Sequence, residues 1–215
     1  MKKLIPLLIL IVATGSSLSL ASCKKEKNNV TPAATAQPDN STALTAFEKE
    51  TITYTREEEK MARDVYNVML AKWNINIFSN ISASEQKHMD AIQTLLTAYN
   101  LPDPVGNNAP GVFTNAEIQQ LYNSLVAKGN ISETDAMITG LTIEDMDIYD
   151  LQQAIQQVQK QDIKTVLGNL LRASKNHMRE FYTQLQNRGG VYSPQYITQQ
   201  EYNDIINSPK EHGGQ

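Results

Sequence analysis

The chain carries acidic and imidazole side chains at helical spacing inside segments that are otherwise apolar. Glu85 and His88 stand three residues apart in SEQKHMDAI, within a stripe of large apolar residues that recurs every three or four positions. Residues three apart lie on nearly the same side of a helix, so both side chains face the side that packs into a core. Because a buried carboxylate without a partner is costly, this placement indicates a site rather than plain packing.

Three other segments also place acids or histidine on an apolar face. Helical phase does not separate Glu58 from Glu59 in REEEKMARDVY, whereas Glu57 falls at the edge of that face and is predicted to be solvated. The inward-facing residues in chain order are Glu58 or Glu59, Glu85, His88, Glu144, Asp147 and His177.

Convergence of these side chains would bring several like charges together in a core. A divalent or trivalent cation reverses that repulsion, and oxygen and imidazole ligands suit iron, manganese and similar metals. The combination of these residues predicts a metal site. A single Glu-x-x-His motif is weak evidence for metal binding, and a lone buried histidine is more often a hydrogen-bonded core residue. The alternative is neutralisation within the protein, by Arg63, Arg172, Lys175 or Arg179, with Asp147 paired to Arg172 or Lys164.

Four long amphipathic segments must position these residues. Strand patterns are nearly absent, so the sequence predicts an all-α fold, a four-helix bundle. A shorter helix beginning at Thr114 or Asn115 and ending at Gly129 is expected between the second and third long helices, and a C-terminal tail helix at about 199–206. The long helices are expected from a Thr45/Glu48 capping box to about Trp73, from Ser82 to Tyr99, from Ser132 to Val158, and from Asp162 to Arg188.

The N-terminal residues read as a secretion signal. MKKLIPLLILIVATGSSLSLASC has two lysines, an apolar run and small residues before the only cysteine of the chain, Cys23. Leu20-Ala21-Ser22-Cys23 resembles a bacterial lipobox, which predicts a signal peptide over 1–22 and lipidation of Cys23. Cleavage near Ala21 with a free thiol is the alternative. The expected location is the cell envelope, with the protein lipid-anchored to a bacterial membrane on its periplasmic or surface side.

The composition then divides the chain into a tether and one domain. Residues 23–43 hold two prolines and almost no large apolar residue, which predicts a flexible tether. The globular domain is expected over 44–207, with a disordered tail over 208–215. The net charge is −4 with dispersed Lys and Arg, so no nucleic-acid partner is expected. The oligomeric state stays open.

The site residues resemble those of the ferritin-like superfamily, and of rubrerythrin within it. Glu85-x-x-His88 matches the second-helix motif, and Glu144 with Asp147 is similar to the third-helix acids. Glu59 with Ala62 and Tyr66 resembles the first-helix pattern, which favours Glu59 over Glu58 as the ligand. The fourth helix departs, because Ser174 stands where the family has the Glu of its second Glu-x-x-His, while His177 is kept. This departure predicts an asymmetric pair of ions or a single ion in place of a symmetric dinuclear site.

The whole domain more closely resembles an uncharacterised ferritin-like group, domain-of-unknown-function family 2202. The segments EEEKMARDVY, FSNISASEQKHMDAI, IEDMDIYDL, SKNHMREF and YSPQYIT carry this resemblance. It implies a ferritin-like fold and leaves the reaction open.

These observations lead to three functional hypotheses. The first is a lipid-anchored domain that binds one or two iron ions, with manganese or another divalent metal as an alternative, and reacts with dioxygen or peroxide as a ferroxidase- or peroxidase-like oxidoreductase. An external electron donor would then be needed, and Tyr66 is a candidate hydrogen-bond donor or redox-active phenol. The second is a metal-sequestering module without turnover. The third is a structural helical bundle without metal.

Overall fold

The computed structural model describes residues 43–212, and these form six helices and no strand. The predicted signal peptide, Cys23 and almost all of the predicted tether lie outside these residues. The all-helical prediction is confirmed. The helices are α1 (Ala46–Trp73), α2 (Asn76–Ala98), α3 (Ala116–Gly129), α4 (Glu133–Gln157), α5 (Gln161–Gln186) and α6 (Gln199–Asn207).

Side-chain caps mark the starts of four of the six helices within the described residues. Thr45 and Glu48 form the predicted capping box at the start of α1, and Ser132 caps α4 through the amide of Asp135. Asn115 rather than Thr114 caps α3. The predicted start of α2 at Ser82 is wrong by six residues, because Asn74 turns the chain in a left-handed conformation and α2 begins directly afterwards, at Asn76.

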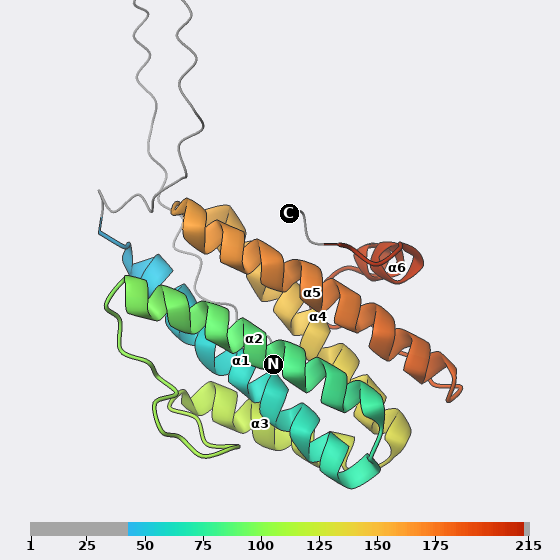
Figure 1. The fold of residues 1–215 in the computed structure, drawn as a ribbon. Coiled ribbons are helices and arrows are strands. Elements are labelled where there is room, and N and C mark those ends of the chain that lie inside the picture. Colours follow the sequence, from blue (N-terminus) through green and yellow to red (C-terminus); the bar gives the residue numbers. More distant parts are fainter. Residues whose placement is uncertain (1–42, 213–215) are drawn as a thin grey trace, which may run out of the picture. The chain divides into compact units, whose positions relative to one another are not determined.

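The four long helices pack as two hairpins that form one bundle. α1 packs most extensively on α2, and α4 on α5, while α1 also contacts α4 and α2 contacts α5 (Figure 1). The connection between the hairpins contains α3, which packs on α1 and α4, and α6 lies against α5. Within the described residues, no helix is both long and apolar enough to span a membrane.

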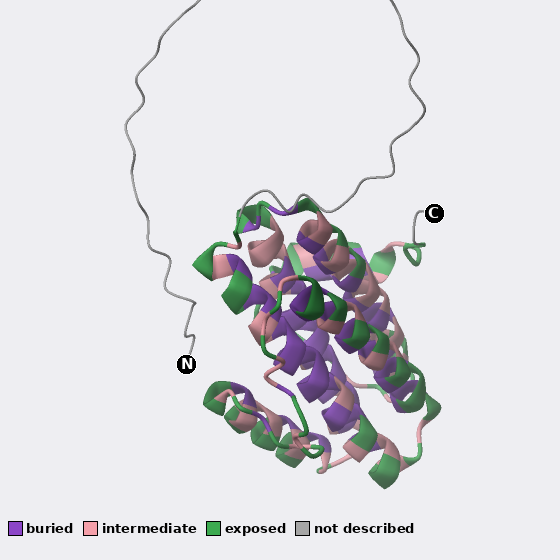
Figure 2. Cartoon of the chain, turned by 60° about the vertical axis from the view of Figure 1, so that its left-hand side comes forward, coloured by how far each residue is buried: buried purple, intermediate pink, exposed green. Residues whose placement is uncertain are grey.

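A polar layer divides the apolar interior of the bundle into two clusters. One cluster includes Ile52, Ile92 and Leu167, and the other includes Met61, Ile81 and Phe181. On α1, α2 and α5 the inward-facing acids and histidines fall between residues of the two clusters, whereas on α4 Glu144 and Asp147 stand among residues of the second cluster, just before Leu151 of the first. Buried positions line the inner sides of the helices and exposed positions their outer sides (Figure 2). The fold therefore holds the predicted site residues at mid-height of the bundle.

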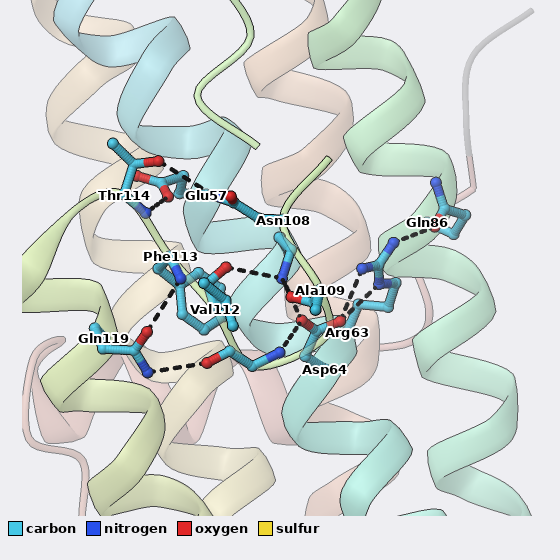
Figure 3. Close-up of polar contacts among 12 residues, drawn as sticks. Glu57, Arg63, Asp64, Gln86, Asn108, Ala109, Val112, Phe113, Thr114 and Gln119 are labelled. Carbon is cyan, nitrogen blue, oxygen red and sulfur yellow. Dashed lines mark hydrogen bonds and ion pairs between the residues drawn. The ribbon is translucent and has the colours of Figure 1, made fainter. Parts of the chain in front are cut away.

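Loop 101–115 is tied to the outer side of α1 by buried charges (Figure 3). Glu57 accepts hydrogen bonds from the amides of Thr114 and Asn115, at 2.5 and 2.9 Å. Lys60 donates to the carbonyls of Ala109 and Val112. The prediction that Glu57 faces solvent is wrong, because this loop covers it and leaves it 3% exposed.

Candidate metal centre

Five of the predicted ligands meet in the polar layer, and they come from all four long helices. They form two groups, Glu59 with Glu85 and His88, and Glu85 with Glu144 and His177. Within each group, one ligand atom from every residue lies within 4.8 Å of the others. All five side chains are buried. The structure thus brings α1, α2, α4 and α5 together around two adjacent positions that share Glu85.

The first group is compact and hydrogen-bonded. Nδ1 of His88 lies 2.7 Å from Oε2 of Glu85 and 3.1 Å from Oε2 of Glu59. The two acids come from α1 and α2, so the imidazole joins the helices of the first hairpin. One nitrogen and two oxygens converge here, a donor set that suits a transition metal.

The second group is close but poorly matched for hydrogen bonding. Nδ1 of His177 lies 3.0 Å from Oε1 of Glu85 and 3.5 Å from Oε2 of Glu144. All three of these atoms are buried, and none has a hydrogen-bond partner of acceptable geometry. Since buried polar atoms are nearly always paired, three orphaned ligand atoms in one place fit a cation as their common partner.

Glu85 is the carboxylate that the two groups share. Its two oxygens each lie beside a different imidazole, and the His88 and His177 rings stack with their centroids 5.7 Å apart. Although burial alone would raise it, the charges of His177 and His88 hold the pKa of Glu85 below its usual range. Glu85 is therefore ionised and available as a bridging ligand.

The other groups titrate far from their usual values because the layer is buried and crowded. Burial raises the pKa of Glu59 to about 7, against the lowering effect of His88. Burial lowers the pKa of His177, but Glu85 and Glu144 outweigh it and raise the value to about 10. Burial also raises the pKa of Glu144, and His177 offsets part of this effect. Without a cation, these raised pKa values favour the protonated forms of Glu59, Glu144 and His177.

Tyr66 contacts the second group directly. Its hydroxyl donates a 2.6 Å hydrogen bond to Oε1 of Glu144, so the phenol orients the carboxylate on the opposite helix. Tyr66 is fully buried and packs against Phe78 and Phe181. The sequence pointed to Tyr66 through its spacing from Glu59, whereas its partner in the fold is Glu144.

Three further residues lie in the layer but outside both groups. Asp147 has Glu58, Glu59, Glu144 and Glu85 as like-charge neighbours, and its Oδ1 has no hydrogen-bond partner. Glu58 is directed to Asp150 instead of to the histidines. Ser174 is 1% exposed, and its hydroxyl donates back to the carbonyl of Leu170. The structure therefore groups Glu59, and not Glu58, with the imidazoles.

The arginines that could have neutralised the acids are engaged elsewhere. Arg63 pairs with Asp64 and Gln86, and Arg172 donates to Asn169. Arg179 binds the chain after α6, through the carbonyls of Ile205 and Ser208 and the Glu211 carboxylate. No ion pair between Asp147 and lysine or arginine occurs within residues 43–212.

A cavity lies between α2 and α5, beside one ligand of the second group. It has a volume of about 290 Å³, and His177 lines it together with Asn80, Ser84, Lys87 and Glu180. Nδ1 of His177 lies near Glu85 and Glu144. A small polar molecule in this cavity would therefore lie beside a ligand of the second group.

Comparison with known proteins gives a consistent result over this domain. A family model described as an uncharacterized protein domain (DUF2202) matches residues 48–209. The uncharacterized protein MJ0754 of Methanocaldococcus jannaschii is 52% identical over 166 residues, which cover 77% of this chain and 90% of the relative. A crystal structure titled as hypothetical protein MJ0754 superposes with a TM-score of 0.78 at 49% identity, covering 83% of this chain and 99% of that one.

Proposed function

The chain belongs to the DUF2202 family of uncharacterized domains, and from that premise we propose that it is a ferritin-like protein whose bundle holds one or two iron ions for reaction with dioxygen or peroxide. The ligands would be Glu59, Glu85 and His88 at one position, and Glu85, Glu144 and His177 at the other. Manganese or another divalent metal suits the same donors.

The orphaned atoms of the second group carry this proposal. Oε1 of Glu85, Oε2 of Glu144 and Nδ1 of His177 are buried, close together and without hydrogen-bond partners. Packing alone does not explain them, because each would cost free energy in a dry interior. A cation at this point would satisfy all three.

Different residues of the chain would have different roles at such a centre. Bound iron would supply the redox electrons. Glu85 holds the two positions together, Tyr66 keeps Glu144 turned toward His177, and the buried layer excludes bulk water. The cavity beside His177 is the route by which a small oxidant would approach. The electron donor would come from another molecule.

Metal content tests the centre. Protein purified without chelators should contain metal in stoichiometric amount, and Glu85→Ala should lose more of it than His88→Ala or His177→Ala, because Glu85 serves both positions. Glu57→Gln is the matched control, since Glu57 is a buried acid of α1 that binds the loop amides. Equal metal content in Glu85→Ala and Glu57→Gln would refute the ligand assignment.

A metal-sequestering role without turnover is the second candidate. Ser174 favours it, because a hydroxyl bonded to Leu170 replaces the fourth-helix carboxylate of the ferritin-like pattern. Anaerobic loading with Fe(II) followed by air separates the two functions. Oxygen uptake in proportion to the iron supports the redox role, whereas iron that stays bound and reduced supports sequestration.

We also propose that the protein is attached to a membrane through a lipid on Cys23. The lipobox-like LASC sequence supports this. Expression with a labelled fatty acid should label the wild type and not Cys23→Ala, and only the wild type should partition into detergent. A labelled Cys23→Ala variant would contradict the anchor.

A further inference from the structure

The chain that follows α6 returns to α5 and is held there by polar contacts. We refer to residues 208–212 as the C-terminal strap. Asn176 makes two hydrogen bonds to the backbone of Glu211, because its Nδ2 donates to the carbonyl oxygen and its Oδ1 accepts from the amide, each at 2.9 Å. Arg179 donates to the carboxylate of Glu211 at 3.0 Å. Side chains on either side of His177 in the sequence therefore fix the strap to α5.

The strap also borders the cavity beside His177. Nζ of Lys210 donates a 2.6 Å hydrogen bond to Oε1 of Glu180. Glu180 and Asn80 line both the cavity beside His177 and a second cavity of about 410 Å³ between α2 and α5, which Lys210 and Arg179 also line. The two cavities are therefore neighbours along the same pair of helices. The strap holds Glu180, the residue of α5 that they share.

The strap is attached less firmly than the helix before it. Residues 209–212 are exposed and Ser208 is half-buried, whereas α6 is anchored by its buried Tyr202 and Ile205. The side chain of Lys210 is 57% exposed, and exposed ion pairs stabilise a fold only slightly. Segments that bury little apolar surface open at a much lower free energy than the whole domain. We therefore expect the strap to leave α5 while the bundle and α6 stay folded.

We propose that the C-terminal strap is a lid that restricts the entry of small polar molecules into the cavity beside His177. Its release separates Lys210 from Glu180 and removes one wall of the second cavity. The side chain of Glu180 is then free to move, and the two cavities open to solvent together. The consequence for the metal centre rests on the proposed function: the strap would set the rate at which a small oxidant reaches His177.

The reactivity of a thiol placed in the cavity tests the lid in protein without metal. Ser84 lines the cavity with His177, and Ser84→Cys in a full-length chain that carries Cys23→Ala provides the only thiol. We compare its rate of alkylation by iodoacetamide in this chain, in a chain that also lacks residues 209–215, and in a control that lacks only 213–215 and keeps the strap. Removal of 209–215 should raise the rate about tenfold, as expected when charged hydrogen bonds that hold a closed state are lost. The control should react like the full-length chain.

Two further variants keep the test decisive. Lys210→Ala/Glu211→Gln removes both ion pairs of the strap, so it should also speed alkylation, and it replaces the deletion if the shortened chain does not fold. Thr139→Cys places the thiol at a fully buried position instead, where reaction requires opening of the bundle itself. Alkylation there should be equally slow with and without the strap. Equal rates at Ser84→Cys in the variants and the control, or an equal acceleration at Thr139→Cys, would overturn the lid.

The role of the lid at the metal centre is measured separately. In protein loaded with Fe(II), oxidation by hydrogen peroxide should be faster without residues 209–215 than without 213–215 alone. Equal oxidation rates would overturn this role, while the alkylation rates still decide whether the strap covers the cavity. Absence of bound metal in the wild type would refute the proposed function, and the alkylation experiment would stand unaffected because it needs no metal.

Discussion

The hydroxyl of Tyr66 donates a 2.6 Å hydrogen bond to Oε1 of Glu144, which joins α1 to α4 inside the bundle. This contact leaves Oε2 of Glu144 as the oxygen directed at His177. The phenol therefore determines which carboxylate oxygen is available to a metal.

Replacing Tyr66 with phenylalanine should weaken the second group selectively. Loss of an outer hydrogen bond to a ligand typically lowers metal affinity about 10- to 100-fold, and the unpaired Glu144 should cost about 1–3 kcal/mol of stability in the metal-free protein. Metal titration and thermal melts measure both effects. Tyr182→Phe, a change in the half-buried Tyr182 that packs on Tyr202, is the control. Unchanged affinity in Tyr66→Phe would remove the orienting role.

The metal-free protein should lose stability as the pH rises. The pKa of Glu59 is raised from 4.5 to about 7 in the fold, so its contribution is complete below pH 4.5 and is lost as the pH rises through 7. The pKa of His177 is raised from 6.5 to about 10, so its contribution is complete below pH 6.5 and is lost through pH 10. Melting temperatures of the apoprotein from pH 5 to 10 should therefore fall, and His177→Gln should flatten the upper part of the curve.

Metal binding should release protons at neutral pH. His177 retains its proton at pH 7.5 without metal, and a metal ligand must be deprotonated. Titration calorimetry in buffers of different ionisation enthalpy should show at least one proton released per chain, and affinity should rise from pH 6 to 8. Heats that do not depend on the buffer would contradict this prediction.

Restoring the missing carboxylate should make the protein more dependent on metal. Ser174→Glu adds an acid to a layer in which Glu59, Glu144 and Asp147 already have raised pKa values. The apoprotein should melt lower than wild type, because another buried charge is unpaired and the larger side chain crowds the site. The rise in melting temperature on adding Mn²⁺ should be larger than in wild type. Ser174→Ala controls for loss of the hydroxyl.

Asp145 is a buried acid of α4 that stabilises the fold, in contrast to its neighbour Glu144, a proposed metal ligand. It is buried and accepts hydrogen bonds from the Tyr192 hydroxyl and from the amides of residues 195–197. Asp145→Ala should cost about 2–4 kcal/mol because these donors lose a charged acceptor. Denaturant unfolding measures the cost. Metal stoichiometry should stay unchanged, since Asp145 lies outside both ligand groups.

The fold was predictable because the sequence of each long helix contains local signals of helix formation. The Thr45/Glu48 capping box and the apolar stripes determine the helices without reference to tertiary contacts. The start of α2 was missed because its N-cap, Ile75, makes no side-chain capping bond, so the sequence carries no capping signal there. Glu57 was misjudged for a different reason. A loop some 50 residues later covers it, and helical periodicity contains no information on loops.

The sequence predicted which residues belong to the candidate site, but not how they divide into two ligand groups. The three-residue spacing of Glu85 and His88 and the phase of Glu144 and His177 placed them inward, as the structure also does. The choice of Glu59 over Glu58 came from a family resemblance, because both lie near the same helical face. The pairing of Glu58 with Asp150 was not predicted, because it joins α1 to α4 and only the fold brings the two acids near each other.

The polar layer between the two apolar clusters has a consequence for motion. In the metal-free protein, we expect the bundle to open most readily at this layer, since hydrophobic contacts are interrupted there and several buried polar atoms lack hydrogen-bond partners. An ion bound in this layer would link the four long helices. The two apolar clusters on either side of it would then unfold as a single cooperative unit. Metal binding would then be detectable far from the ligands, as slower amide hydrogen exchange throughout the helical bundle.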